Sequence, residues 1–168
     1  MKVIETERLL IRPFEEKDIE ASYIMNLDAE VSRYTGDGGV VTRKEMERRI
    51  KEHVFGDYTK YGYGRMAVEW KDDRNFIGFC GLKYLPELDE IDLGYRFMQQ
   101  HWGKGIATEA GKAILDFGFS DLNLKRIIAL VLPENHGSIR VLDKLGFTFE
   151  KEIVEDGQLE RQFVKRHN

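Results

Sequence analysis

A glycine-containing turn between an apolar strand and a helix constrains this chain more than any other feature. The strand-like residues 91–98 lead into Gly103 and Gly105, and a helical pattern begins at once. Successive backbone N–H groups of such a turn, with the unpaired N–H groups of the helix start, point into one concavity. Together with the helix dipole they form a site for a pyrophosphate. Lys104 adds positive charge at the same place.

The turn does not match the common nucleotide-binding motifs. Its pattern, Gln100-x-x-Gly103-x-Gly105, lacks the lysine and hydroxyl residue that end a P-loop, and it lacks the third glycine or alanine of the dinucleotide fingerprint. Taken alone, the two glycines fit a tight turn without a ligand equally well.

The hydrophobic pattern along the rest of the chain predicts an α/β fold. Strands are expected at residues 3–13, 64–70, 75–85, 91–98, 126–132, 147–154 and 159–166. Helices are expected at residues 15–26, from an N-cap at Thr42 to about residue 55, and at residues 108–122 and 135–145. This order predicts a single domain over residues 1–168, with a mixed sheet and helices on both of its faces.

Composition excludes several classes of function. The net charge of −4 gives no basic footprint for nucleic acid, and no apolar run is long enough for a signal peptide or a membrane span. We therefore expect a cytoplasmic protein that binds neither nucleic acid nor membrane. The single cysteine, Cys80, lies in an apolar run and is expected to be a small buried residue, and the four histidines show no metal-ligand spacing.

Several segments together resemble the GNAT superfamily of acetyl-coenzyme A-dependent N-acetyltransferases, and most of all its RimJ/RimL-like branch of ribosomal-protein N-terminal acetyltransferases. Residues 5–13 (ETERLLIRP) and 76–82 (FIGFCGL) are similar to the first and third strands of that branch. Residues 93–95 (LGY) with 102–110 (WGKGIATEA) are similar to its pyrophosphate motif, and residues 135–147 (NHGSIRVLDKLGF) to its second coenzyme motif.

The resemblance implies a twisted, mostly antiparallel mixed sheet in which strands 92–97 and 127–132 splay apart to admit acetyl-coenzyme A, with no metal. The side chain of Asn135 would bind near the pantetheine arm, and Arg140 would reach the adenosine phosphates or remain solvated. The coenzyme contacts that it implies are Phe97, Met98, Gln100, Trp102, Gly103, Lys104, Gly105, Ile106, Ala107, Thr108, Asn135, Ser138 and Arg140.

Acetyl transfer to an amine needs a base, because an ammonium has no lone pair with which to attack. Asp92 is the first choice, two residues before Gly94, where the family pattern often carries Glu; the shorter Asp would act through a water. Glu90, on the same face of the strand, is the second choice. Either residue also fits an ordinary surface carboxylate.

The proton donor for the leaving thiolate is less defined by the sequence. Many family members carry a Tyr seven residues after the motif Asn, where this chain has Leu142. Ser138 is the predicted substitute, although its hydroxyl also fits a local helix contact. Tyr95 points away from the face of Asp92 and is expected to be core.

The acceptor is an amine whose identity the resemblance leaves open. By analogy, Tyr34, Trp70 and the loop of residues 36–39 are expected on the acceptor side. A protein N-terminal α-amine, attacked directly in a ternary complex, is the leading hypothesis. A small amine such as a polyamine, amino acid or aminoglycoside is the second, and a non-catalytic coenzyme A-binding module the third. The protein would be a monomer, or a homodimer paired through an exposed final strand.

Overall fold

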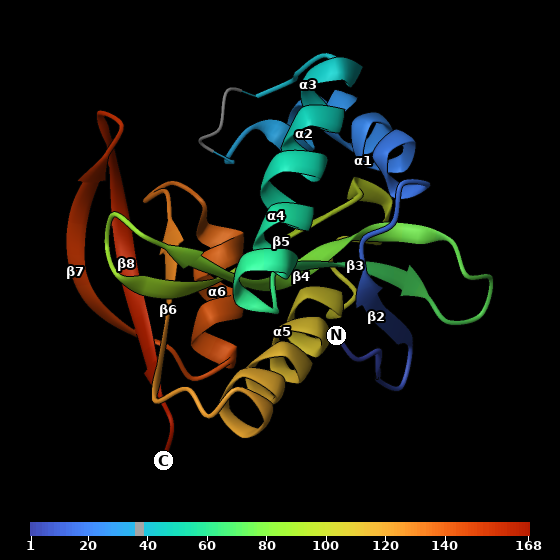
Figure 1. Cartoon of the computed structure of the whole chain (residues 1–168). Coiled ribbons are helices and arrows are strands. Elements are labelled where there is room, and N and C mark those ends of the chain that lie inside the picture. The colour runs from blue at the N-terminus through green and yellow to red at the C-terminus, as the bar shows by residue number, and fades with distance from the viewer. Residues whose placement is uncertain (36–38) are drawn as a thin grey trace.

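The computed structural model describes residues 1–35 and 39–168, and one eight-stranded sheet runs through this part of the chain (Figure 1). The strand order is β1-β2-β3-β4-β5-β6-β8-β7. The strands are β1 Ile4–Glu5, β2 Leu9–Pro13, β3 Arg65–Trp70, β4 Phe76–Leu85, β5 Glu90–Phe97, β6 Arg126–Val131, β7 Thr148–Glu155 and β8 Gln158–Arg166. Every neighbouring pair is antiparallel except β5 and β6, which are parallel. The predicted mixed, mostly antiparallel sheet is confirmed.

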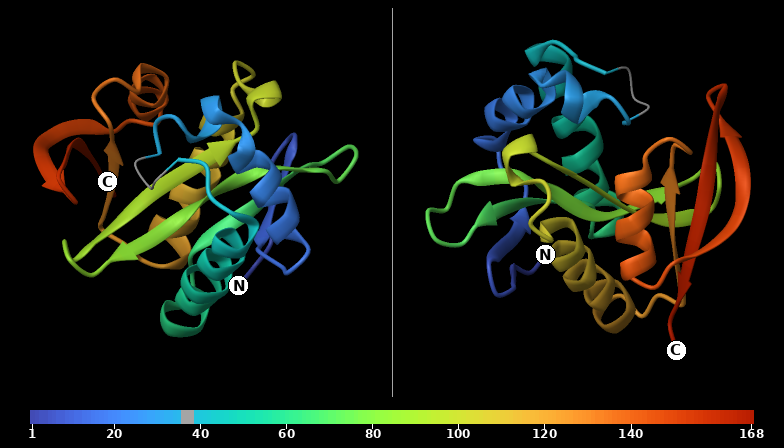
Figure 2. Two further views of the ribbon diagram at one scale, coloured as in Figure 1. Left: turned by 90° about the horizontal axis from the view of Figure 1, so that it is seen from above. Right: turned by 180° about the vertical axis from the view of Figure 1, so that it is seen from behind.

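Helices cover both faces of the sheet, as predicted. They are α1 Asp18–Leu27, α2 Ala29–Ser32, α3 Arg43–Arg49, η1 Ile50–Val54, α4 Phe55–Tyr61, η2 Gln99–His101, α5 Ile106–Asp116, η3 Phe117–Asp121 and α6 His136–Lys144. α5 and α6 lie on one face and α1 to α4 on the other (Figures 1 and 2). Side chains alternate along each strand, so Val68 joins the core under α5 and α6, and Ala67 joins the core under α1 and α3. Cys80, on β4, is fully buried.

The N-terminal segment forms two short strands, so the prediction of one strand over residues 3–13 was wrong. A turn at residues 6–8 separates β1 from β2. The carboxylate of Glu109, in the first turn of α5, holds this turn: it accepts hydrogen bonds from the Thr6 hydroxyl at 2.6 Å and from the Arg8 backbone N–H at 2.9 Å. Pairing with a residue 101 positions away therefore interrupts the strand.

The helix capped by Thr42 is longer than the sequence predicts. The Thr42 hydroxyl accepts from the backbone N–H of Glu45 at 3.1 Å, which confirms the cap. The predicted end near residue 55 was wrong, because the π-helical turn η1 carries the chain into α4, which ends at Gly62 with a left-handed φ of 81°. The short helix α2 was not predicted, and α5 begins two residues before the predicted start at residue 108.

The last strand is not at the edge of the sheet. β8 lies between β6 and β7, so β7 forms the edge (Figure 1). The predicted pairing of an exposed final strand across a dimer was therefore wrong. None of the described helices has the length and apolar character to span a membrane.

A buried ion-pair network ties β2 to α1 and β3. Arg12 donates from Nε to Glu69 at 2.7 Å, and from its two terminal nitrogens to Asp18 at 2.8 and 2.9 Å. All three side chains are almost fully buried. Removing one partner of a buried pair leaves an uncompensated charge, which costs far more than the loss of an exposed pair.

We expect Arg12→Met to lower the free energy of unfolding by about 3–5 kcal/mol, because Asp18 remains buried without its cation and, among the described residues, Glu69 keeps only its pair with Arg74. Urea denaturation would measure the loss. Arg43→Met is the matched control, since Arg43 makes an equally short pair with Glu20, at 2.6 Å, on the exposed surface. That control should cost about 1 kcal/mol or less. Equal losses in the two variants would contradict the structural role of the Arg12 network.

Candidate active site

The site is positioned by the gap between β5 and β6. Among the described residues these strands share one register pair, Asp92 with Ile128. β5 otherwise pairs with β4, and β6 with β8. The two parallel strands therefore part toward their carboxyl ends, and the backbone of residues 94–97 faces a slot. The splayed strand pair expected from the sequence is present.

Ion pairs of Arg126 hold the closed end of this slot. From the first position of β6, its Nε donates to Oε1 of Glu90 on β5 at 2.9 Å. Its Nη1 donates to Oε2 of Glu150 on β7 at 2.7 Å, and Gln162 donates to the same carboxylate at 2.7 Å. Glu90, the second choice for the base, is thus occupied as a clamp, and this contact argues against its acting as the proton acceptor.

The glycine turn lies at the open end. Gly103 and Gly105 have left-handed φ values of 75° and 76°, and no described atom lies within 4 Å of the position that a Cβ of Gly103 would take. Trp102 donates from its indole N–H to the carbonyl of Phe97 at 2.8 Å, which fixes the turn to the end of β5. This open turn at Gly103 and Gly105, here called the cradle, leads directly into the N-terminus of α5, where a pyrophosphate site is expected.

The start of α5 continues the cradle, although its residues contribute unequally. Ile106 is buried in the core, so only its backbone N–H faces outward. Ala107 and Thr108 follow in the same first turn, and Met98 and Gln100 lie in the segment that precedes the cradle. Lys104 is exposed within the turn. The structure thus gathers into one place the predicted coenzyme residues between positions 97 and 108.

Arg8 is a residue at the cradle that the sequence analysis missed. Its Nε donates to Oε1 of Glu109 at 2.7 Å, and its Nη2 lies 3.6 Å from the position of a Cβ on Gly105. The guanidinium therefore lies beside the glycine turn and adds a cation to it. No motif in the sequence indicated this contact, because it forms only when the turn at residues 6–8 packs against α5.

The start of α6 faces β5 across the slot. The side chain of Asn135 caps the helix, its Oδ1 accepting from the backbone N–H of Ser138 at 3.2 Å. The Ser138 hydroxyl in turn lies 2.8 Å from the hydroxyl of Tyr95 on β5. Burial raises the pKa of Tyr95 to about 12, although the hydrogen bond to Ser138 opposes the shift. Tyr95, expected only as a core residue, thus holds a phenol proton at the slot.

The remaining positions of the second motif have different environments. Leu142, where many relatives carry a Tyr, is buried in the core and supplies no proton. Arg140 is exposed on α6. Its two predicted alternatives, a coenzyme phosphate contact and solvation, both remain predictions.

Asp92 lies on the opposite face of β5 from Tyr95 and is bound by Arg65. Nη2 of Arg65 donates to Oδ1 of Asp92 at 3.0 Å, and Nη1 donates to the carbonyl of Gly81 at 2.6 Å. The guanidinium lies across Gly94, where a Cβ would be 2.5 Å from Nη2. Gly94 is therefore a glycine because the arginine that orients Asp92 passes over it.

Glu160, on β8, is a second carboxylate of this region that sequence reasoning missed. Burial, together with the negative charges of Glu155, Asp92 and Asp156, raises the pKa of Glu160 to about 7. A half-buried carboxyl that titrates near neutral pH is suited to proton transfer. Glu160 interacts electrostatically with Asp92 because β8 lies beside β6 in the sheet, and no local sequence motif reveals this strand order.

A cavity of about 450 Å³ lies between α1, α3, η1 and the sheet, on the same face as Asp92. Its lining is mainly apolar and cationic: Phe14, Ser22, Met25, Glu45, Met46, Arg48, Arg49, Ile50, His53, Val54, Arg65, Phe79, Lys83 and Arg96. Arg65 belongs to this wall and also binds Asp92, so the cavity adjoins the candidate base. An acceptor can therefore approach from this side.

The two aromatic residues predicted for the acceptor do not line this cavity. Trp70 is on the α5 side of the sheet, where its ring stacks on His101 with centroids 6.0 Å apart. Its placement beside the glycine turn removes the basis for its predicted role. Tyr34 packs under the guanidinium of Arg33 at 5.1 Å. Of the predicted loop at residues 36–39, residues 36–38 lie outside the described residues.

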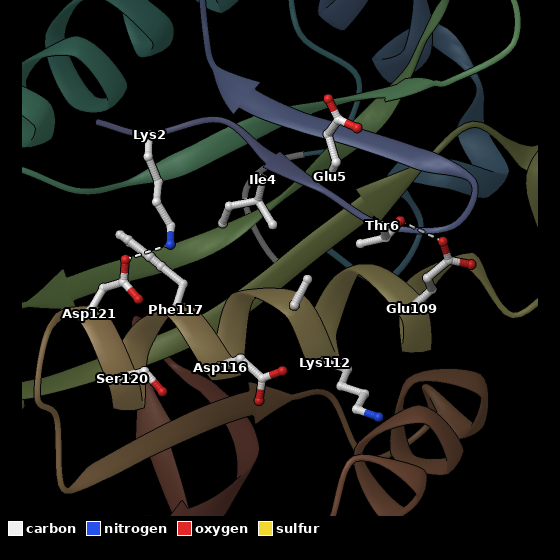
Figure 3. A pocket seen from close by; sticks show the side chains of 11 residues that line it. Lys2, Ile4, Glu5, Thr6, Glu109, Lys112, Asp116, Phe117, Ser120 and Asp121 are labelled. Atoms are coloured by element: carbon white, nitrogen blue, oxygen red, sulfur yellow. Dashed lines mark hydrogen bonds and ion pairs between the residues drawn. The ribbon is translucent and has the colours of Figure 1, made fainter.

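A second hollow, of about 400 Å³, lies between β1 and α5 (Figure 3). Some of its polar side chains pair with one another: Lys2 with Asp121 at 2.6 Å, and the Thr6 hydroxyl with Glu109. The groove is thus separate from the slot between β5 and β6. In the described part of the chain, no group of three or more His, Cys, Asp or Glu side chains is placed to hold a metal.

A mixed sheet whose parallel strand pair parts beside a glycine turn at a helix start is the arrangement expected of an acyl-coenzyme A-dependent transferase. The comparisons give the family: the sequence matches the Acetyltransferase (GNAT) domain over residues 8–148, and the chain belongs to this family. It is an acyltransferase.

Of two related proteins, one is uncharacterised and the other is a spermidine acetyltransferase. The chain is 34% identical over 152 residues to an uncharacterised N-acetyltransferase, p20, of Bacillus licheniformis, covering 89% of this chain and 84% of that protein. It is 27% identical over 157 residues to the spermidine N(1)-acetyltransferase of Escherichia coli K12, covering 91% and 80%.

Solved structures share the fold over almost the whole chain. A GNAT-family acetyltransferase from Bacillus anthracis superposes with a TM-score of 0.83 at 30% identity, covering 98% of both chains. The ribosomal-protein α-N-acetyltransferase RimL, in complex with coenzyme A, superposes with a TM-score of 0.82 at 15% identity, also covering 98% of both chains. At that identity the second likeness shows the fold alone.

We expect Gly103→Val to weaken coenzyme A binding by about tenfold or more, because a branched side chain fills the cradle and resists the left-handed backbone. Isothermal titration calorimetry would measure the affinity. Gly157→Val is the matched control: Gly157 has the same left-handed φ, 77°, in the β7–β8 turn, again with no described atom near its Cβ position. The control carries the same backbone strain and should bind as wild type. Equal affinities for all three proteins would contradict the assignment of the cradle.

Proposed function

We propose that this enzyme transfers the acetyl group of acetyl-coenzyme A to a primary α-amine, foremost that of a protein or peptide N-terminus. The amine attacks directly in a ternary complex. One observation carries the proposal: Arg65, which lines the cavity on the α1/α3 side, binds Asp92, the position on β5 beyond which the β5–β6 slot opens. An acceptor in the cavity would thus lie next to the strand along which the donor is expected.

The residues of the slot fit coenzyme A. When bound, acetyl-coenzyme A supplies the activated acetyl thioester. The open cradle at Gly103 and Gly105 would hold its pyrophosphate through main-chain amides, with Arg8 and Lys104 as nearby cations. The unpaired edge of β5 beyond Asp92 would pair with the pantetheine arm as an added strand does.

Glu160 and Asp92 are the carboxylates that we assign to amine deprotonation. Asp92 is already paired with Arg65, whereas Glu160 has a pKa near that of a free α-amine. Proton transfer from an α-ammonium, with a pKa of about 7.8, to such a carboxylate is nearly balanced. Transfer from a Lys-like ammonium, at about 10.4, is more than three pK units uphill. In this assignment Asp92 raises the basicity of Glu160 and attracts the ammonium.

Tyr95 and Ser138 are the residues that we assign to protonating the leaving sulfur. Their hydroxyls are hydrogen-bonded to each other between β5 and α6, so a phenol proton lies next to the Ser138 hydroxyl at the slot. In this assignment Ser138, the substitute expected from the sequence, would relay the proton of Tyr95 to the sulfur.

A polyamine acceptor is the second candidate, favoured by the likeness to a spermidine acetyltransferase. The cationic wall of the cavity argues against it, because a polycation would meet like charges. Coenzyme A release and mass spectrometry with N-terminal peptides, spermidine, free amino acids and an aminoglycoside would separate the candidates. Acetylated peptides support the proposal. Acetylated spermidine with unmodified peptides would contradict it.

The kcat, with both substrates saturating, should rise with pH around a midpoint near 7, because the base must lose its proton and the pKa of Glu160 is about 7. Glu160→Gln should remove this rise and lower kcat at pH 8 by about a hundredfold. Asp92→Asn should move the midpoint to lower pH, since it deletes a neighbouring negative charge. An unchanged profile in Glu160→Gln would rule out Glu160 as the base.

Stability gives an independent readout for the same variant. Folding raises the pKa of the Glu160 carboxyl to about 7, so its ionisation above pH 7 destabilises the folded state. Below its unfolded-state pKa of about 4.3 the carboxyl is protonated in both states, and this destabilisation is absent. Glu160→Gln should therefore melt at a higher temperature than wild type at pH 8, and at the same temperature at pH 4. A lower melting temperature at pH 8 would show that the activity loss reflects misfolding.

A further inference from the structure

We propose that the cavity between α1, α3 and the sheet binds a carboxylate of the acceptor, so that the preferred acceptors are amines that also carry an acidic group. This inference rests on the proposed function and names its substrate class. The carboxylate is either the acidic side chain of an N-terminal peptide or the α-carboxylate of a free amino acid.

The charge of the cavity wall is the first observation. Five cationic side chains reach it from four elements: Arg48 and Arg49 from α3, Arg65 from β3, Lys83 from β4 and Arg96 from β5. Glu45 is the one carboxylate among the described lining residues. It is already held by Arg48 at 2.7 Å and by Arg49 at 3.2 Å. The wall therefore presents donors and positive charge to an occupant.

The partners of two of these cations lie outside the lining. Arg65 pairs with Asp92 at 3.0 Å, and Lys83 pairs with Asp57 at 3.0 Å, yet neither carboxylate lines the cavity. Arg96 lies over the ring of Phe79, with Cζ 5.5 Å from the centroid, and both residues face the cavity. A guanidinium has five N–H donors, so a resident partner still leaves donors for a ligand carboxylate.

A buried hydroxyl in the same wall is the second, independent observation. Ser22 on α1 is 4% exposed and lines the cavity, and its Oγ has no hydrogen-bond partner. Buried hydroxyls are normally satisfied, because a lost hydrogen bond is costly. An acceptor oxygen bound in the cavity would satisfy it. The charge of the wall could be balanced by ions from solution, but the unpaired hydroxyl of Ser22 indicates a ligand that accepts a hydrogen bond.

The size and floor of the cavity fit a small organic acid. Its volume of about 450 Å³ is within the usual range for small-molecule sites. Apolar side chains make up the rest of the lining: Phe14, Met25, Met46, Ile50, Val54 and Phe79. Such a floor accommodates the methylene groups of an acidic side chain.

Opposite charges at the two ends would orient the acceptor. The amine end meets the carboxylates of Asp92 and Glu160, whose charges interact. Arg65 binds Asp92 and also lines the cavity, where its positive charge and that of Arg96 would attract the acidic group. An acceptor with both groups binds in one direction only. A polyamine lacks the group that the cavity selects.

The test compares peptides that differ at one position after a common N-terminal residue: glutamate, glutamine or lysine at the second position, with free glutamate and glutamine as the amino-acid arm. We expect kcat/KM to fall by about tenfold from glutamate to glutamine, and further for lysine. Added salt should reduce this preference. Transfer to free glutamine and free glutamate at similar rates, both faster than to the acidic peptide, would identify the α-carboxylate as the bound group.

Three variants connect the preference to the cavity. Arg96→Gln and Ser22→Ala should each reduce the glutamate-over-glutamine ratio, and Arg96→Glu should shift preference toward the lysine peptide. Ser22→Ala removes an unsatisfied buried group, so it keeps the fold and the test remains valid if the Arg96 variants are unstable. Arg43→Gln is the matched control, since Arg43, at the start of α3, is not among the described residues that line the cavity and pairs with Glu20 at the surface. It should leave the ratio unchanged.

The outcomes distinguish this inference from the proposed function. Equal rates for the glutamate and glutamine peptides, with the free amino acids reacting no faster, would overturn the inference and leave α-amine acetylation standing. If no peptide is acetylated, peptide binding can be measured by calorimetry with coenzyme A present. Selective binding of the acidic peptide without acetyl transfer would support the cavity and overturn the proposed function. Binding that ignores the second residue would overturn the inference.

Discussion

The rest of the site depends on the parting of β5 and β6, which Arg126 limits to one end. A parallel pair needs a crossover connection, and here α5 provides it, leaving β5 and returning to β6. The carboxyl ends of both strands, and the helix starts that follow them, therefore lie together at the open end. Because Arg126 binds Glu90 and Glu150 at the other end, the opening has one direction. The position of the anion-binding cradle follows from this topology.

Strand alternation on β5 divides the chemistry between the two faces of the sheet. Tyr95 points toward α6, while Asp92 and Arg96 belong to the face under α1 and α3. In the function proposed above, the donor and the acceptor approach from opposite sides of the sheet, and the gap in the β5–β6 ladder beyond Asp92 would let them meet.

The sequence predicted the features that are local in the chain. The glycine turn, the caps at Thr42 and Asn135 and the meander of β3 to β5 each rest on contiguous residues. Contacts set by the tertiary fold were missed: Glu109 with Arg8, and Glu160 with Asp92, depend on strand order. Trp70 was misplaced for a different reason. Side chains alternate along β3, so Trp70 lies on the same face as Met66 and Val68. The predicted acceptor role of Trp70 relied on analogy with family loops and did not use this alternation.

The burial of Cys80 has a practical consequence for enzymology on this protein. It is the single cysteine of the chain, lies on β4 with no exposed surface, and burial raises its pKa to about 12. A thiolate is the form that reacts with disulfide dyes, and this thiol neither ionises at neutral pH nor meets solvent. In the folded enzyme, every equivalent of dye consumed therefore reports a molecule of coenzyme A set free, and a slow background colour would measure unfolding.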